Sequence, residues 1–340
     1  MLTERQELVL RRVVEVYLED PAPVGSRLLS EGFNWGPSTI RNELANLEEL
    51  GLLAHPHTSA GRVPTEAGYR YFVDRLLPES DSGAMSTPPL ALSLAPHELD
   101  EAMRVTTETL SQVTDLLAIV TAPPLQTATI RHVELLMLQP EVVMVVVITS
   151  TGGVTKRMFS FDRAVDPGLA DWAGAYLNER LVGTGLGARR LGQRLLDLSL
   201  SPTELDFLTA LSPVFTELSE SEQEGVYFDG AARLLAAGRG GPVSELNSLV
   251  GMLERRVTML SALRSALGER ELAVRIGAEN DQPALRSMAV VAASYGLPQR
   301  TLGAVSVIGP LWMDYPLVIR AVRAAAAQLS SFVTDVYDER

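Results

Sequence analysis

The chain has 340 residues, of which 46% are hydrophobic and 21% are charged, and it carries a net charge of −13 and no cysteine. This length and composition predict several folded domains and not an extended disordered chain. The lack of cysteine excludes disulfides, thiolate zinc sites and cysteine nucleophiles, and the acidic balance by itself argues against a nucleic-acid partner.

The N-terminal 20 residues mix charged and apolar side chains, so they lack the continuous apolar core of a signal peptide. The longest apolar run, at residues 142–148, is too short to span a bilayer. We therefore expect a cytoplasmic protein with no membrane segment.

Residues 1–77 have the pattern of three helices followed by a hairpin. The first helix begins at Thr3, with Gln6 in the capping-box position, and ends before Pro21. A short second helix is predicted at residues 25–31. The third helix is predicted between Gly36 and Gly51, because Pro37 suits the first helical position and a glycine suits the C-terminal cap.

The third predicted helix has one apolar and one polar face. Ile40, Leu44 and Leu47 fall on one side, which should face the core. The other side and its flanks carry small, amide and guanidinium groups, at Ser38, Thr39, Arg41, Asn42 and Asn46. Arginine can form paired hydrogen bonds with guanine and asparagine with adenine, so this face suits a reader of the DNA major groove.

The segment after this helix predicts a β-wing. Residues 52–55 read as a strand that Pro56 ends, and a polar loop precedes Val63. The loop residues suited to the sugar-phosphate backbone or the minor groove are His57, Thr58, Ser59 and Arg62. Arg70, on the helix after the wing, completes the predicted DNA-binding set, and we expect it to share a surface with Arg41 and Arg62 although residues 1–77 sum to about −3.

The rest of the chain predicts an α+β arrangement with an insertion. The expected division is a winged-helix domain (1–77), a linker (78–96), the first part of an α+β domain (97–165), an inserted subdomain (166–220) and the second part of the α+β domain (221–340). Helices are expected at 97–120, 243–267 and 317–336, with several more within 166–218; strands are expected at 141–148, 154–161, 272–276, 287–293 and 302–308.

Other candidate sites are weaker. His55 and His57 lie on one face of a strand by geometry alone and have no third ligand nearby, so no metal is expected. The glycine-rich residues 183–187 lack the Lys-Ser/Thr of a phosphate-binding P-loop and read as a turn. No nucleophile elbow or paired carboxylates are recognisable, so we expect neither catalysis nor a cofactor.

Several motifs resemble the HrcA family of heat-inducible transcription repressors. The resemblance lies in residues 38–42 (Ser-Thr-Ile-Arg-Asn), in residues 56–65 (Pro-His-Thr-Ser-Ala-Gly-Arg-Val-Pro-Thr) with 68–71, and near the C-terminus in residues 276–279 and 308–315. It covers nearly the whole chain, and Trp312 departs from it, since the family usually has arginine there.

The resemblance implies a multidomain α+β homodimer. Its parts would be a winged helix-turn-helix, a GAF-like α+β domain and an inserted, mainly helical dimerisation subdomain. It implies binding to double-stranded DNA at an inverted-repeat operator, CIRCE, upstream of chaperonin and DnaK operons, and modulation by a GroEL-type chaperonin.

Three alternatives stay open at this point. The winged helix can serve protein contact alone, in a chaperone-associated protein that does not bind DNA. The GAF-like domain can sense a small ligand, in a pocket near Glu279 or Tyr315. The polar wing loop can be no more than a solvated turn.

Overall fold

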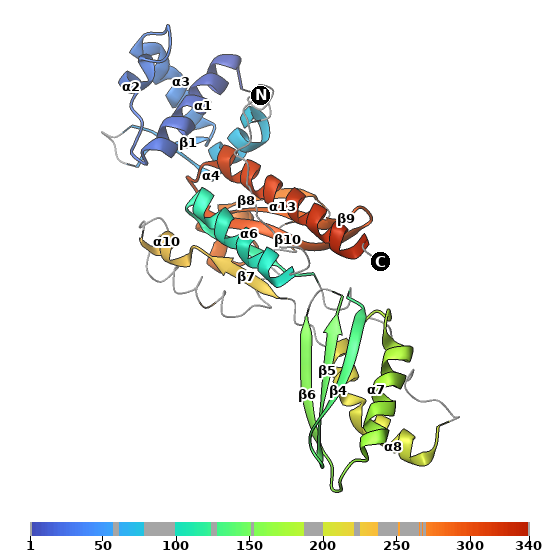
Figure 1. Ribbon diagram of the computed structural model, residues 1–340. Coiled ribbons are helices and arrows are strands. Elements are labelled where there is room, and N and C mark those ends of the chain that lie inside the picture. Colours follow the sequence, from blue (N-terminus) through green and yellow to red (C-terminus); the bar gives the residue numbers. More distant parts are fainter. Residues whose placement is uncertain are drawn as a thin grey trace.

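The computed structural model describes residues 2–56, 61–77, 99–123, 128–150, 153–186, 200–220, 225–236 and 270–338, with Gly251, Ser265 and Leu267. These residues form three bodies that follow one another along the molecule (Figure 1). The predicted linker at residues 78–96 and most of the helix predicted at 243–267 lie outside the described residues.

The N-terminal body is a bundle of three helices completed by a two-stranded wing and a further helix. Its elements are α1 (Glu4–Glu19), α2 (Ser26–Ser30), α3 (Pro37–Glu49), β1 (Leu53–Ala54), β2 (Val63–Pro64), α4 (Glu66–Tyr71) and the π-helical turn η1 (Phe72–Leu76). The capping box of Thr3 and Gln6 is formed, Pro37 opens α3, and Gly51 adopts φ of 73° just after α3. The caps that the sequence predicts therefore set these helix ends.

The central body is a five-stranded antiparallel sheet with strand order β7-β3-β10-β9-β8. The strands are β3 (Leu117–Thr121), β7 (Val226–Asp229), β8 (Leu272–Ile276), β9 (Met288–Leu297) and β10 (Arg300–Pro310). Helices α6 (Leu99–Thr114) and α13 (Tyr315–Asp338) cover one face (Figure 1). The short elements are α10 (Ala231–Ala236), which packs on β3, and the 3-10 turns η4 (Gly277–Glu279) and η5 (Pro283–Leu285).

The prediction of a helix at residues 97–120 is wrong for the last six residues. The helix ends at Thr114, Asp115 takes a positive φ of 54°, and residues 117–121 form strand β3, which lies between β7 and β10. Every residue of β3 is buried. An apolar run buried on both faces has no period, and this is why the sequence pattern could be continued as a helix.

Helix α13 is long and apolar enough, by length and composition alone, to cross a membrane. Its apolar stripe is buried in the central body, where Val322, Ala325 and Leu329 are fully covered. Since it packs against β9, β10 and α6, α13 has the surroundings of the core helix of a globular domain.

The third body corrects the predicted domain division. It combines the antiparallel sheet β4-β5-β6 with three helices, and it lies at the far end of the central body from the winged helix (Figure 1). Its elements are β4 (Ile130–Gln139), β5 (Val142–Thr149), β6 (Val154–Ser160), α7 (Pro167–Leu181), α8 (Pro202–Leu211) and α9 (Pro213–Glu220). The strands expected at 141–161 therefore belong to the insertion, which starts after β3 and contains a three-stranded sheet beside its helices.

The packing of the third body explains this correction. Val143, Val145 and Val147 alternate along β5 and pack in one core cluster with Leu177 and Phe215. That cluster is separate from the clusters that contain the residues of the central sheet. Strands that pack on helices of the same segment cannot be assigned to a neighbouring sheet by their pattern alone.

Candidate nucleic-acid interface

Helix α3 presents the predicted polar face to solvent. Ile40, Leu44 and Leu47 are buried, as the helical pattern predicts. On the opposite side Ser38, Arg41, Asn42 and Asn46 are exposed and Thr39 is half-buried, and these five residues are the part of the candidate interface that α3 supplies. The small, amide and guanidinium groups therefore lie where a duplex can reach them.

Acidic side chains of α3 are largely paired with arginines. Glu43 lies 3.7 Å from Arg5, and Glu48 lies 2.7 Å from Arg62. The Arg5 guanidinium also stacks on Trp35, at 5.1 Å from the ring centroid. The domain has a negative net charge, but ion pairs neutralise Glu43 and Glu48 beside the polar face of α3.

The wing is anchored at its base. Strands β1 and β2 pair antiparallel, and Arg62 forms two backbone hydrogen bonds with Val24, at 2.8 and 2.9 Å. The Arg62 side chain is only 17% exposed, because it bonds to Glu48 and His55. Arg62 is therefore held at the base of the wing by its partners, and its predicted contact with DNA stays a prediction. His57, Thr58 and Ser59 lie outside the described residues.

Arg70 also departs from the expected surface. It points from α4 to the central body, where Nε donates to Glu279 Oε1 at 2.8 Å and Nη2 donates to the Val274 carbonyl at 2.7 Å. It also pairs with Asp74. Arg70 therefore does not join Arg41 in one contact face, and it connects two bodies of the chain.

The contact between α4 and the central body is a specific polar clamp. Glu66 accepts a hydrogen bond from the Ala278 N–H at 2.9 Å. Burial lowers the pKa of Arg70, but its hydrogen bonds to Glu279 and Asp74 outweigh this and the net shift is upward. For Glu279, burial raises the pKa, and the hydrogen bonds from Arg70 and the Ile276 N–H reverse the sign. Both shifts favour the charged pair.

The surroundings of Glu279 and Tyr315 are filled by contacts within the protein and do not form the effector pocket considered above. Glu279 is taken up by Arg70, and Tyr315 is fully buried, with its hydroxyl donating to the Leu311 carbonyl at 2.7 Å. Tyr69 of α4 packs on Tyr315 with ring centroids 5.9 Å apart, and burial raises the pKa of both phenols. Helix α4 thus occupies the place considered for a ligand in the alternative of a ligand-sensing domain.

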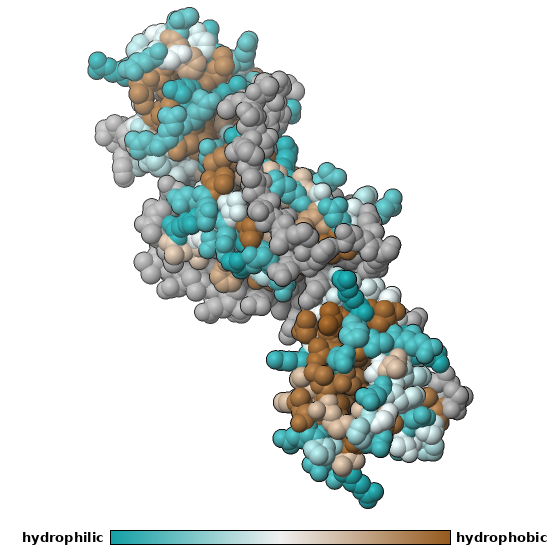
Figure 2. Space-filling view, viewed as in Figure 1, coloured by the Kyte–Doolittle hydropathy of each residue, from teal (hydrophilic) through white to brown (hydrophobic). Residues whose placement is uncertain are grey.

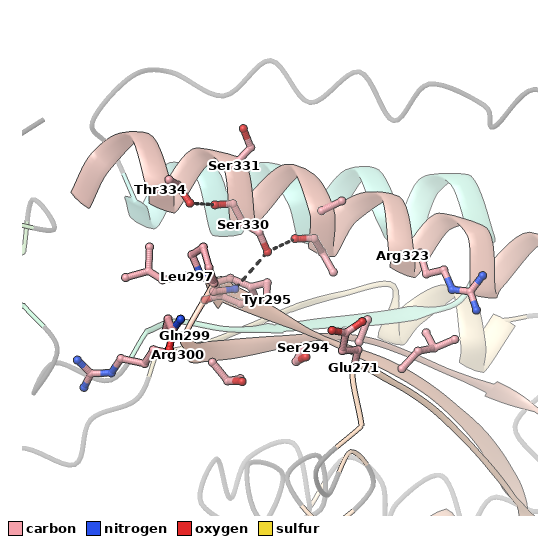
Figure 3. Close-up of a pocket in the computed structure, with 17 residues that line it drawn as sticks. Glu271, Ser294, Tyr295, Leu297, Gln299, Arg300, Arg323, Ser330, Ser331 and Thr334 are labelled. Atoms are coloured by element: carbon pink, nitrogen blue, oxygen red, sulfur yellow. Dashed lines mark hydrogen bonds between the residues drawn. The ribbon is translucent and has the colours of Figure 1, made fainter. Parts of the chain in front are cut away.

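A cavity of about 870 Å³ lies elsewhere in the central body, between α13 and the β9–β10 end of the sheet (Figure 3). Ser330 on its wall accepts from the Gly296 N–H at 3.1 Å. Arg300 and Arg323 lie at opposite ends and point away from each other (Figure 3). Its charged groups therefore do not converge on one point.

The histidines and glycines that the sequence analysis weighed as weaker candidate sites lie in structural contacts and turns. Within the described part of the chain, no three His, Asp or Glu side chains gather as metal ligands. His55 bonds to Glu48 and Arg62. Gly183 follows α7 with φ of 79°, which is a helix C-terminal cap and not a phosphate cradle.

A three-helix unit with a wing and an exposed polar third helix defines the N-terminal body as the DNA-binding part of a transcription regulator. Comparison with known families agrees with this class. Residues 1–75 match the winged helix-turn-helix transcription repressor, HrcA DNA-binding domain, and residues 100–319 match the HrcA protein C-terminal domain. The chain therefore belongs to the HrcA family of transcription repressors, and it is not an enzyme.

Curated relatives match over nearly their full length. The heat-inducible transcription repressor HrcA of Thermobifida fusca is 39% identical, with 96% of this chain and 95% of that protein covered. The HrcA of Halalkalibacterium halodurans is 32% identical over the whole of both chains. A crystal structure described as a hypothetical protein shares the fold, with a TM-score of 0.73, 22% identity and coverage of 99% and 100%.

Proposed function

We propose that this repressor binds, as a homodimer, an inverted-repeat operator of the CIRCE type and represses chaperonin and DnaK operons. The observation that carries the proposal is the exposed face of α3, on which Ser38, Arg41, Asn42 and Asn46 are solvent-accessible while the apolar face is buried. A protein with twofold symmetry suits an operator with twofold symmetry. We also infer a cytoplasmic location, because the proposed target is DNA.

In this proposal α3 reads bases in the major groove. Arg41 and Asn42 make the base-specific contacts, while Ser38, Thr39 and Asn46 allow close approach or bond to the backbone. The wing residues His57, Thr58 and Ser59 contact the neighbouring backbone. Substituting Asn42 or Arg41 with alanine should cost about 1–3 kcal/mol at particular base pairs. Arg286→Ala, at an exposed arginine of the central body, is the matched control and should bind like the parent protein.

Homodimer formation is supported by the free face of the three-stranded sheet. One face of β5 packs on the helices, and its other face carries Met144, Val146 and Ile148 between β4 and β6. Met158 and Val154 on β6 are 67% and 61% exposed. Figure 2 shows apolar side chains gathered over this sheet. An apolar patch of this kind is typical of an interface.

The dimer is tested by the sedimentation of a charged variant. Met158→Glu should dissociate the dimer and weaken operator binding, because a buried charge would lie in the interface. Ala210→Glu adds the same charge on an exposed position of α8, and we expect it to remain dimeric. A dimeric Met158→Glu protein would show that another surface holds the two copies together.

We infer that a GroEL-type chaperonin modulates this repressor and that the central body is GAF-like. The support is family membership together with the sheet covered by α6 and α13. A partner that favours the folded, active state raises its population by mass action. Gel shifts with the inverted-repeat operator, before and after heating and with or without chaperonin, test this. Equal recovery in both arms would refute the chaperonin's role, and no operator preference at all would refute the repressor assignment.

A second candidate is a ligand-sensing repressor, and the cavity of about 870 Å³ beside α13 is the observation that favours it. This volume is in the range of small-molecule sites. Helix α13 runs from this cavity to Tyr315 at the contact with α4. A ligand in the cavity would raise the melting temperature and change operator affinity together, and metabolite extracts can be screened for both effects.

A further inference from the structure

The side chain of Arg62 lies in the angle between the end of α3 and the base of the wing. Its Nη2 is 2.7 Å from Glu48 Oε2, and its Nη1 is 2.5 Å from His55 Nε2. His55 Nδ1 is in turn 3.3 Å from Glu48 Oε1. A guanidinium only donates, so Nε2 accepts and the ring proton on Nδ1 points to Glu48. The three side chains therefore form a closed ring of hydrogen bonds.

The backbone on both sides of Arg62 is equally fixed. Arg62 and Val24 exchange two backbone hydrogen bonds, and a Cβ on Gly61 would lie 2.3 Å from the Val24 carbonyl oxygen. Only glycine permits this close approach. Arg62 thus joins the segment before α2, the end of α3, the residue after β1 and the start of β2.

These contacts leave Arg62 poorly placed for DNA. The side chain is 17% exposed, both terminal nitrogens are engaged, and Nε is buried. To contact a phosphate, the guanidinium would have to abandon Glu48 and leave a half-buried carboxylate without its partner, which is costly.

We propose that Arg62 is a positioning residue: with Glu48 and His55 it fixes the angle between helix α3 and the wing, and it does not itself grip a phosphate. The inference rests on the proposed function, because it assumes that α3 and the wing contact the same duplex.

The hydrogen-bonded ring of Arg62, Glu48 and His55 matters more for binding to the operator than for non-specific binding to DNA. When α3 enters the groove, a wing held at a fixed angle reaches the adjacent backbone without a further ordering cost. A loosened wing has to be ordered at the moment of binding. Non-specific binding depends on the total charge facing the phosphates, so it is almost insensitive to the angle.

The test measures binding to the inverted-repeat operator and to unrelated duplex DNA at several salt concentrations. The variants are Arg62→Lys, Arg62→Gln, Glu48→Gln and the double variant of the last two. Glu49→Gln is the matched control, since it removes the same charge from the next, exposed position of α3. Thermal unfolding of each variant establishes that it is folded.

We expect Arg62→Lys, Arg62→Gln and Glu48→Gln each to bind the operator about tenfold more weakly, the ordering cost of a few side chains. The salt slope and binding to unrelated DNA should stay as in the parent, and the double variant should be no weaker than either single one, because both lose the same ring. Glu49→Gln should bind like the parent. Arg62→Lys keeps the charge, so its loss of affinity separates position from charge.

Other results would refute the positioning role of Arg62. If Arg62 gripped a phosphate, Arg62→Gln would flatten the salt slope by about 0.9 and Arg62→Lys would restore it. If Glu48 merely competed with DNA for Arg62, Glu48→Gln would bind more tightly than the parent. A parent protein that does not prefer the operator refutes the proposed function instead, whatever the variants do.

Discussion

Breaking the clamp between α4 and the central body should lower the stability of the protein measurably. Arg70 donates to both carboxylate oxygens of Glu279 and to the carbonyl of Val274. Replacing it with glutamine leaves a half-buried carboxylate and a strand carbonyl without these donors. The perturbation is therefore local, polar and confined to the contact between two bodies.

The magnitude follows from the exposure of the pair. The side chains of Arg70 and Glu279 are 27% and 35% exposed, so the pair lies between a surface ion pair, worth up to about 1 kcal/mol, and a buried one, whose disruption costs about 3–5 kcal/mol. We expect a loss of about 2 kcal/mol for Arg70→Gln. For a chain of 340 residues that corresponds to about 3 °C in melting temperature.

Calorimetry of Arg70→Gln beside Arg75→Gln provides the assay. Arg75 is exposed on η1 and its substitution removes the same charge from the same segment, so we expect little change there. The double variant Arg70→Gln, Glu279→Gln should recover part of the loss, because it removes the unpaired carboxylate. Equal melting temperatures for Arg70→Gln and Arg75→Gln would refute the reasoning.

Two further changes probe the same contact. Gly277→Ala should destabilise the protein by about 1–3 kcal/mol, because φ is 56° and the added Cβ would lie 2.1 Å from the Glu66 carboxyl carbon. The control Gly174→Ala lies in open space on α7, away from this contact, and should stabilise the protein by about 0.5–1 kcal/mol. Thermal unfolding measures both effects. The pKa of Glu279 is lowered below 4.5 in the folded protein, so its stabilisation is present above that pH and is lost as the pH falls through the lowered value. Urea unfolding at several acid pH values should show the difference between the parent and Glu279→Gln narrowing, and a constant difference would contradict the assignment.

Local features of the sequence predicted the recognition unit well. Thr3 with Gln6, Pro37 and Gly51 set the ends of α1 and α3 through contacts within one helical turn. The buried stripe of α3 follows from its period alone. Such signals involve neighbours in the chain, so a single sequence is enough to read them.

The errors concern residues whose partners lie far away in the chain. Arg70 is basic and follows a wing, yet its partner Glu279 is 209 residues further on. Glu48, which pairs with Arg62, lies 14 residues before it, near the end of α3. Period and charge cannot show such pairs, and the assignment of strands 141–161 to the central body was wrong for the same reason.

The short segment from Thr65 to Arg70 connects the DNA-reading parts to the rest of the molecule. Thr65 caps α4 through the Gly68 N–H and donates to the Gly51 carbonyl at the end of α3, at 3.1 and 2.6 Å. Within the same helix, Glu66 and Arg70 hold the central body. Thr65, which contacts the end of α3, is therefore the neighbour of Glu66, which contacts the central body. This clamp fixes the direction of α3 relative to the central body. In a dimer held through the third body, both copies of α3 must meet their half-sites at a fixed separation, since avidity is lost when geometry forbids simultaneous contact. Heating that loosens the clamp, even with the winged helix still folded, should thus abolish operator binding before it abolishes the binding of a single half-site.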